Sequence, residues 1–292
     1  MTERELLDLI ARARFWRWKE LDLAGLDLEV LPPEIGSLVN LKRLVLGKYD
    51  ERISTEPLGN KLTDLPVEIG SLKNLESLSL YCNLLTQFPR SIEQLSNLQT
   101  LDISCNDITI IPESIERLIN LQVFDLSANC IEIFPESVTR LINLKHLNLG
   151  VNDDDQNPLV IPKSTGQMVN LEKLDLYCNQ IKVIPESIGK LTNLQELNLG
   201  HNQIEVIPES ISQLTNLKKL SLHYNQIEVI PESVSKLTSL QELSLSNNQI
   251  KLIPESISKL TNLKRLNLYN NQIEVTPESL KHLDILKNWK IS

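Results

Sequence analysis

Residues 199–233 read LGHNQIEVIPESISQLTNLKKLSLHYNQIEVIPES, and the run NQIEVIPES occurs in them twice, 23 residues apart. Gly200 and His201 precede the first copy, whereas His223 and Tyr224 precede the second. One part of the unit therefore stays the same while the two residues beside it change. A unit that returns at a period of this length predicts a stack of similar repeats in place of separately folded domains.

The same pattern, L-x-x-L-x-L-x-x-N-x-I, extends in both directions along the chain. Its asparagines follow one another every 23 residues, apart from one step of 27 between Asn152 and Asn179, and they are Asn60, Asn83, Asn106, Asn129, Asn152, Asn179, Asn202, Asn225, Asn248 and Asn271. Counting the unit that begins at Trp18, we predict eleven repeats over residues 18–285, with insertions near 47–59 and 153–160. Residues 1–17 are predicted to form an N-terminal capping helix, and residues 286–292 a C-terminal cap or a truncated repeat.

Each repeat carries apolar residues at two different spacings. Leu194, Leu197 and Leu199 alternate as in a short strand, and the wider spacings that follow from Ile204 to Leu214 suit a turn and a short helical segment. Stacking such strands about 4.8 Å apart in a parallel sheet buries all of these positions. We therefore predict an α/β fold, a right-handed solenoid shaped like a horseshoe, with a concave parallel sheet and short helical or 3-10 turns on the convex side.

The invariant Asn and Pro have structural roles in this interpretation. The Asn amide can satisfy backbone groups that the turn leaves unpaired, and the Pro six residues later can open a short helical turn. A cation often follows four residues after the adjacent Glu, as in Glu186 and Lys190 or Glu232 and Lys236. These spacings predict solvated ion pairs along each helical turn.

The repeat resembles that of leucine-rich-repeat proteins of the 23-residue LPxxIxxLxNL type, found in bacterial proteins and in Ras-group-related intracellular proteins. The opening WKELDLAGLDLEVLPPEIGSLVNLKRLVLGK, with the insertion before GNKLTDLPVEIGSL, also resembles the repeat region at the start of cyanobacterial Roco proteins. This second resemblance implies an alternative function, the sensing or scaffolding region of a larger Roco-like GTPase signalling protein. No G-x-x-x-x-G-K-[ST] phosphate loop is present, so GTPase activity is not carried over.

The composition of the chain limits the kinds of partner and the cellular location that we expect. The net charge of -9 and the pI near 5.1 oppose binding to nucleic acid or to an anionic membrane. The four cysteines form no CxxC motif, the N-terminal segment is highly charged, and no apolar run reaches membrane-spanning length. We therefore expect a cytoplasmic protein with free thiols and no membrane contact.

The variable pair before each repeated Asn gathers residues suited to recognition. Tyr and His offer contact area and a polar tip at low entropic cost, which favours binding of a protein or a peptide. The predicted partner-binding residues on the concave face are Tyr81, Tyr177, His201, His223, Tyr224, Asn247, Tyr269 and Asn270. The simpler alternative is that the tyrosines only cover the backbone of neighbouring strands.

The sequence gives little support for a catalytic site or a metal site. Cys178, His201 and His223 fall on three successive strands, but they lack a fourth metal ligand and a carboxylate to orient a histidine. Asp153, Asp155 and Asn157 match the first offsets of a calcium loop, whose required Gly is replaced by Pro158. The alternating column Lys173, Glu196, Lys219, Glu242 and Arg265 is better explained as a structural charge ladder. We expect a non-enzymatic module that has no cofactor and does not take a small molecule as its ligand.

Overall fold

The computed structural model describes residues 1–49, 56–152 and 158–275. The predicted cap at 286–292, the calcium-loop residues Asp153, Asp155 and Asn157, and part of each insertion lie outside these residues. The chain divides into two compact units, Met1–Ile131 and Glu132–Ser292. Each unit is described by itself.

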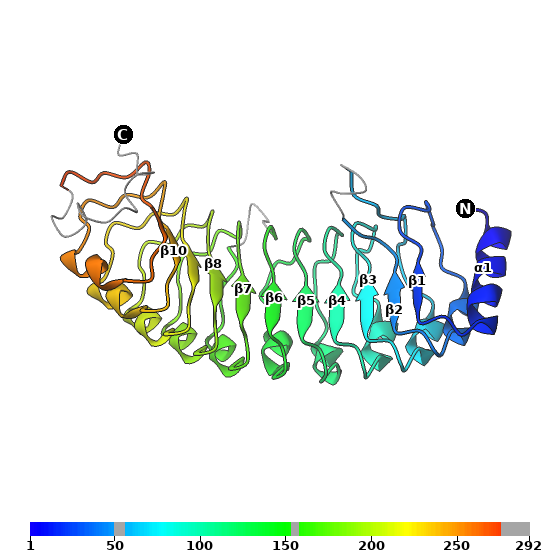
Figure 1. The fold of residues 1–292 in the computed structure, drawn as a ribbon. Coiled ribbons are helices and arrows are strands. Elements are labelled where there is room, and N and C mark those ends of the chain that lie inside the picture. The colour runs from blue at the N-terminus through cyan, green and yellow to red at the C-terminus, as the bar shows by residue number, and fades with distance from the viewer. Residues whose placement is uncertain (50–55, 153–157, 276–292) are drawn as a thin grey trace. The chain divides into compact units, whose positions relative to one another are not determined.

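The first unit opens with helix α1 (Glu3–Phe15) and continues as strands separated by 3-10 turns (Figure 1). Thr2 and Glu5 form the capping box of α1, and Leu6, Ile10 and Ala13 form its buried face. The strands pair in parallel in chain order: β1 (Glu20–Asp22), β2 (Arg43–Val45), β3 (Ser77–Ser79), β4 (Thr100–Asp102) and β5 (Val123–Asp125). The turns are η1 (Pro33–Ser37), η2 (Val67–Ser71), η3 (Arg90–Gln94) and η4 (Glu113–Arg117).

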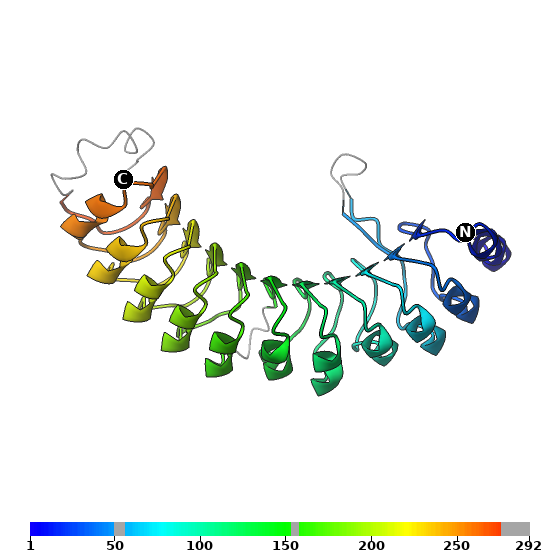
Figure 2. The ribbon, with the colours of Figure 1, turned by 60° about the horizontal axis from the view of Figure 1, so that its bottom comes forward.

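The second unit has the same construction. Its parallel strands are β6 (His146–Asn148), β7 (Lys173–Asp175), β8 (Glu196–Asn198), β9 (Lys219–Ser221), β10 (Glu242–Ser244) and β11 (Arg265–Asn267). Its 3-10 turns are η5 (Glu136–Arg140), η6 (Lys163–Gln167), η7 (Glu186–Lys190), η8 (Glu209–Gln213), η9 (Glu232–Lys236) and η10 (Glu255–Lys259). Within each unit the strands lie on one side and the turns on the other (Figure 2), which confirms the predicted solenoid of parallel strands and 3-10 turns.

The core of each unit consists of the repeated Leu and Ile positions. In one repeat, Leu197 and Leu199 from the strand segment and Ile204 from the return segment are at most 1% exposed. Each repeat thus buries its apolar residues against its two neighbours, as the spacing predicts.

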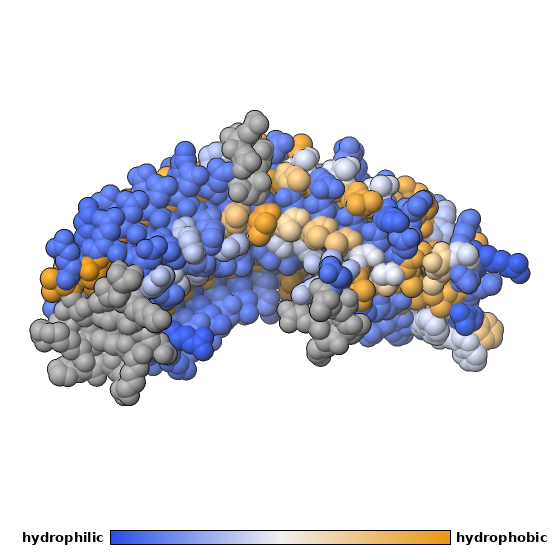
Figure 3. Space-filling view, turned by 90° about the horizontal axis from the view of Figure 1, so that it is seen from above, coloured by the Kyte–Doolittle hydropathy of each residue, from blue (hydrophilic) through white to orange (hydrophobic). Residues whose placement is uncertain are grey.

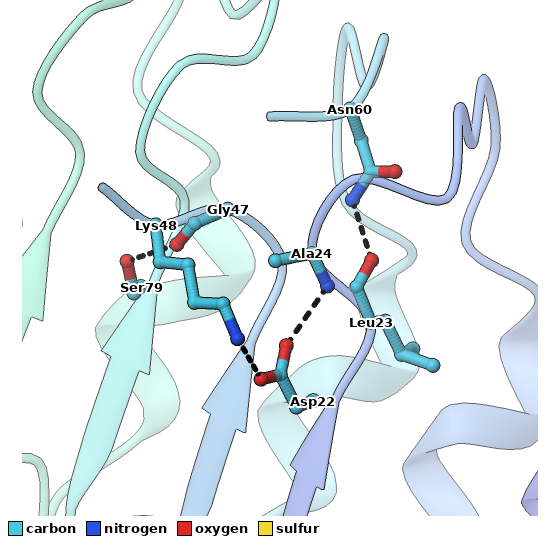
Figure 4. A network of polar contacts seen from close by, with 7 residues as sticks. All are labelled: Asp22, Leu23, Ala24, Gly47, Lys48, Asn60 and Ser79. Atoms are coloured by element: carbon cyan, nitrogen blue, oxygen red, sulfur yellow. Dashed lines mark hydrogen bonds and ion pairs between the residues drawn. The ribbon is translucent and has the colours of Figure 1, made fainter. Parts of the chain in front are cut away.

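The repeated asparagines join adjacent repeats through their side chains. Asn202 Oδ1 accepts the backbone N–H groups of Asn179 (3.1 Å) and Ile181 (2.9 Å), and its Nδ2 donates to the carbonyls of Leu176 and Leu199, both at 3.0 Å. Asn60 makes the corresponding bond to the Leu23 carbonyl at 2.9 Å in the first unit (Figure 4). The predicted ladder of buried asparagines is confirmed.

The repeated prolines precede the 3-10 turns, as predicted. Pro208 is the N-cap of η8, and its carbonyl accepts the N–H of Ile211 at 3.0 Å. The predicted ion pairs along the turns are wrong for two repeats, because no ion pair joins Glu186 with Lys190 or Glu232 with Lys236 in the described structure. A 3-10 turn has three residues per turn, so residues four apart do not share a face.

Candidate binding face of the second unit

In the second unit, a side chain at the end of several strands accepts a hydrogen bond from the backbone N–H two residues later. In β6, β7, β8 and β11 the third strand residue is Asp or Asn, and its Oδ1 accepts the N–H two positions later, as from Tyr177 to Asp175 at 2.9 Å and from Tyr269 to Asn267 at 3.1 Å. The first unit uses the same device, where Asp22 accepts the Ala24 N–H and also pairs with Lys48 (Figure 4). In the second unit this bond holds the backbone of the predicted site residues Tyr177 and Tyr269, and it was not among the features predicted from the sequence.

The second residue of each variable pair has a left-handed backbone. The φ angle is 53° at His201 and Tyr224, 55° at Asn247 and 54° at Asn270. These positions are therefore not free to accept any side chain, which corrects the simple contrast between a constant frame and a variable pair. Asn and His tolerate this conformation well, whereas a bulky residue such as Tyr224 rarely adopts it.

Four of the predicted residues form one contiguous group, here called the ring cluster: Tyr177, His201, His223 and Tyr224. The His201 and Tyr224 rings stack with centroids 4.1 Å apart, and the His201 and Tyr177 rings lie 4.9 Å apart. His223 completes the group at 5.3 Å from His201 and 5.8 Å from Tyr224. Residues from the repeats of β7, β8 and β9 thus make a single surface of packed rings.

Two neighbours hold the His223 ring in place. The Ser221 hydroxyl lies 2.7 Å from His223 Nδ1. A Cβ atom at Gly200 would come within 2.3 Å of His223 Cε1, so the absence of a side chain at Gly200 provides the space for the ring. Burial, with a smaller contribution from the charge of His201, lowers the pKa of His223 below its ordinary value. The neutral imidazole is therefore favoured at this site.

The remaining predicted residues lie apart from the ring cluster. Asn270 Nδ2 donates to Asn247 Oδ1 at 2.7 Å, so these two residues form a pair. Tyr269 is 47% exposed and makes no ring contact within residues 158–275. Tyr81 belongs to the first unit, where its ring lies 6.3 Å from that of Tyr49 and burial raises its pKa.

The charge column on the sheet face forms ion pairs between adjacent strands. Lys173 pairs with Glu196 at 3.1 Å, and Arg265 pairs with Glu242 at 3.4 Å. The strand register places the members of each pair directly opposite each other. Such exposed pairs contribute about 0 to 1 kcal/mol, which agrees with a mainly structural role.

A metal site has no geometric support here. Across the described residues, no group of three His, Cys, Asp or Glu side chains is placed to hold a metal ion. His201 and His223 instead contact tyrosine rings. The described part of the chain also contains no helix long and apolar enough to cross a lipid bilayer.

A polar hollow that was not among the features predicted from the sequence lies at the opposite end of the strands in the second unit. It has a volume of about 660 Å³ and is lined by Lys145, Glu172, Gln195, Lys218, Ser239 and the asparagines 143, 170, 193 and 216. Lys218 Nζ donates to Gln195 Oε1 at 2.8 Å, and Asn193 Nδ2 donates to the Val169 carbonyl at 2.8 Å. The Asn before each strand recurs with the repeat and could have predicted this feature.

Figure 3 shows the opposite edge, at which the strands end, and the second unit is mainly hydrophilic there.

Comparison with known proteins identifies the family. Leucine-rich repeat models match residues 59–108 and 97–153, a leucine-rich repeat region model matches 163–245, and a two-copy repeat model matches 238–284. A leucine-rich repeat protein of Leptospira interrogans is 35% identical over 96% of this chain and 79% of its own, with a TM-score of 0.70. The chain belongs to the leucine-rich repeat proteins. Comparison with curated proteins gave no match.

Two plant receptors are also similar in structure. The Arabidopsis receptor kinase HAESA, solved with the peptide hormone IDA and the co-receptor SERK1, is 30% identical over 90% of this chain, with a TM-score of 0.76. The plant peptide hormone receptor RGFR1, solved with RGF2, is 28% identical over 94% of this chain, with a TM-score of 0.72. The chain spans 44% and 47% of these receptor chains. The leucine-rich repeat is a protein-interaction fold, and these members bind peptides.

Proposed function

We propose that this leucine-rich repeat protein is a non-enzymatic interaction module that binds a protein or peptide on the sheet face of its second unit. The observation that carries the proposal is the ring cluster, in which four aromatic side chains from three successive repeats pack together. Tyr224 is 49% exposed although it stands at the end of a well-packed strand segment. Partly exposed aromatic groups on a rigid frame are typical anchors of protein interfaces.

The structural neighbours support a peptide or protein as the ligand class. HAESA and RGFR1 were each solved with a peptide partner, and both share the fold with this chain. Asn247, Tyr269 and Asn270 extend the proposed face from the ring cluster toward β11. Tyr81 would act in the first unit, separately from this cluster. The acidic charge of the chain disfavours nucleic acid and membranes as partners.

The finer family assignment is part of the proposal. We propose that the chain is of the bacterial 23-residue type and acts in the cytoplasm. A Roco-like protein, whose GTPase domain would follow the repeats, is the alternative on the sequence resemblance of the opening repeats. A reading frame that continues beyond Ser292 into a G-x-x-x-x-G-K-[ST] loop would favour that alternative.

The test compares partners captured by the wild-type protein and by a variant with Tyr177, His223, Tyr224 and Tyr269 changed to Ala. Affinity purification and mass spectrometry identify candidates, and each candidate is then purified and tested for direct binding. We expect the variant to lose the partner while its melting temperature stays within a few degrees, because the changed side chains are outside the Leu and Ile core. Undiminished binding by the folded variant would contradict the proposed face.

A further inference from the structure

The return segments of the second unit carry an exposed apolar column that the proposed function does not use. We call it the apolar ridge: Ile133, Val160, Val183, Val206, Val229, Leu252 and Val275. These side chains are 66–77% exposed. Backbone bridges pair Val229 with Leu252 and Leu252 with Val275, so these three ridge residues lie side by side.

Packing does not require an apolar residue at this position. Within one return segment, Ile204 and Ile207 supply the buried contacts at 0% and 3% exposure, whereas Val206 between them is 69% exposed. At the equivalent position the first unit has exposed Val30 and Ile110 but also exposed Asp64 and Gln87, in repeats of the same fold. An extended backbone favours branched residues, yet Thr would satisfy that preference without exposing an apolar surface. A continuous apolar column on an exposed surface indicates an interaction site.

The ridge is bordered by acidic residues. Exposed glutamates follow the repeated prolines at Glu186, Glu209, Glu232 and Glu255, whereas the exposed Lys163 follows Pro162 in the repeat of Val160. The residues directly before the ridge positions from Val183 onward are Lys182, Glu205, Glu228, Lys251 and Glu274, and Lys251 pairs with Glu228 at 3.8 Å. Glutamates therefore outnumber lysines along the ridge. A complementary partner must combine an apolar stripe with basic residues beside it.

The spacing of the ridge distinguishes between partner conformations. Segments paired in a parallel sheet lie about 4.8 Å apart, so the bridged part of the ridge, from Val229 to Val275, presents one apolar side chain at about that interval. An α-helix presents an apolar residue on one face every turn, with a pitch of about 5.4 Å. A β-strand presents residues on one face at intervals of about 6.7 Å, which differ more from the spacing of the ridge than the pitch of a helix does. A helix therefore fits the ridge better than an extended peptide.

From these observations we propose that the apolar ridge of the second unit binds an amphipathic α-helix of a protein partner, with Lys or Arg flanking its apolar face. The helix lies along the ridge, its apolar residues contact successive repeats, and its basic residues face the flanking glutamates. The apolar ridge and the ring cluster share no residue, so the two sites can be tested independently.

The probe is a synthetic helical peptide of about 18 residues with Leu on one face and Lys on both flanks. Its binding to the full chain is measured by fluorescence anisotropy, beside a matched peptide in which Glu replaces Lys. The test variant carries Val183→Gln, Val206→Gln and Val229→Gln, because Gln already occupies this position at Gln87 in the first unit. Melting temperatures establish that the variant is folded, and the Tyr224→Ala variant serves as the control for the other surface.

We expect the Lys peptide to bind the wild type and Tyr224→Ala with similar affinity and the Gln variant at least roughly tenfold more weakly. The Glu peptide should bind much more weakly than the Lys peptide. Equal binding of the Lys peptide to the wild type and the Gln variant, or no binding up to about 1 mM, would overturn the proposal. Sedimentation velocity provides a second arm. A concentration-dependent dimer that the Gln variant cannot form would assign the ridge to a second copy and would also overturn the proposal.

Discussion

A buried residue and a solvent-facing residue stand side by side at each strand end. Asn225 is 8% exposed and joins repeats, whereas the adjacent Tyr224 is 49% exposed and belongs to the ring cluster. The left-handed backbone at Tyr224 turns the chain so that its neighbour can enter the interior. A change at Asn225 should therefore lower stability, whereas a change at Tyr224 should weaken binding and leave stability nearly unchanged.

Asn202→Ala should lower the free energy of unfolding by about 2 to 4 kcal/mol, because it leaves the N–H groups of Asn179 and Ile181 without their acceptor. The matched control is Asn216→Ala, which removes one exposed bond of 2.9 Å to the Thr192 carbonyl. The control should cost about 0.5 to 1.5 kcal/mol. Urea denaturation measures both, and equal losses would contradict the role given to the buried asparagines.

His223 should make stability depend on pH. Its pKa is lower in the folded protein than its ordinary 6.5, so the unfolded chain binds more protons between these two values. This contribution to stability is complete above about pH 6.5 and is lost as the pH falls toward the folded pKa. His223→Gln should lose less stability than the wild type between about pH 7.5 and 5. Parallel loss in both proteins would show that the His223 pKa is not lowered.

The strand and the 3-10 turn of each repeat contribute differently to the fold. A strand has one buried leucine between two residues of the sheet face, as Leu197 between Glu196 and Asn198. A turn is preceded by Pro and packs against the turns of adjacent repeats, and several turns contain a buried serine hydroxyl, such as that of Ser233 in η9. Substitutions at a buried and at an exposed position of the same strand or turn should therefore change the stability by different amounts.

Leu197→Ala should destabilise the protein by about 2 to 5 kcal/mol, because Leu197 is 1% exposed and the change leaves a cavity. Its neighbour provides the control. Glu196→Ala removes only the exposed pair with Lys173 and should cost less than about 1 kcal/mol. Guanidinium denaturation measures both variants. A tolerated Leu197→Ala would mean that this strand position is not part of the core.

Ser233→Ala should leave stability unchanged or raise it by up to about 1 kcal/mol, because the buried Ser233 hydroxyl has no partner among the described residues. Ser235→Ala in the same turn removes a 2.7 Å bond to the Glu232 carbonyl and should be mildly destabilising. Thermal unfolding compares the two. If Ser233→Ala proves the more harmful change, the Ser233 hydroxyl has a partner in solution.

At the scale of the molecule, periodicity made the fold predictable and left the contacts of the site undetermined. Burial recurs with every repeat, so the positions of Leu197, Asn202 and Pro208 follow from spacing alone. The ring cluster depends on how side chains from adjacent repeats orient, which spacing does not specify. The space that Gly200 leaves for His223 is equally invisible in one repeat. The left-handed backbone had a signal, since Asn247 and Asn270 occupy positions that favour such residues.

The second unit combines two surfaces of different chemistry on one frame. The ring cluster is aromatic and lies at the ends of β7, β8 and β9, whereas the apolar ridge is aliphatic and bordered mainly by glutamates. The overall charge of -9 favours partners that carry basic residues. We therefore expect distinct partners, or distinct parts of one partner, at the two surfaces.

The dissociation constant of the purified partner complex, measured by isothermal titration calorimetry for the wild type and Tyr224→Ala, tests the central claim most directly. Tyr224 stacks on His201 and is the most exposed member of the ring cluster. Loss of an aromatic anchor of this kind costs about 2 kcal/mol or more, so we predict at least roughly thirtyfold weaker binding with an unchanged melting temperature. An unchanged dissociation constant for the folded variant would contradict a binding face centred on the ring cluster.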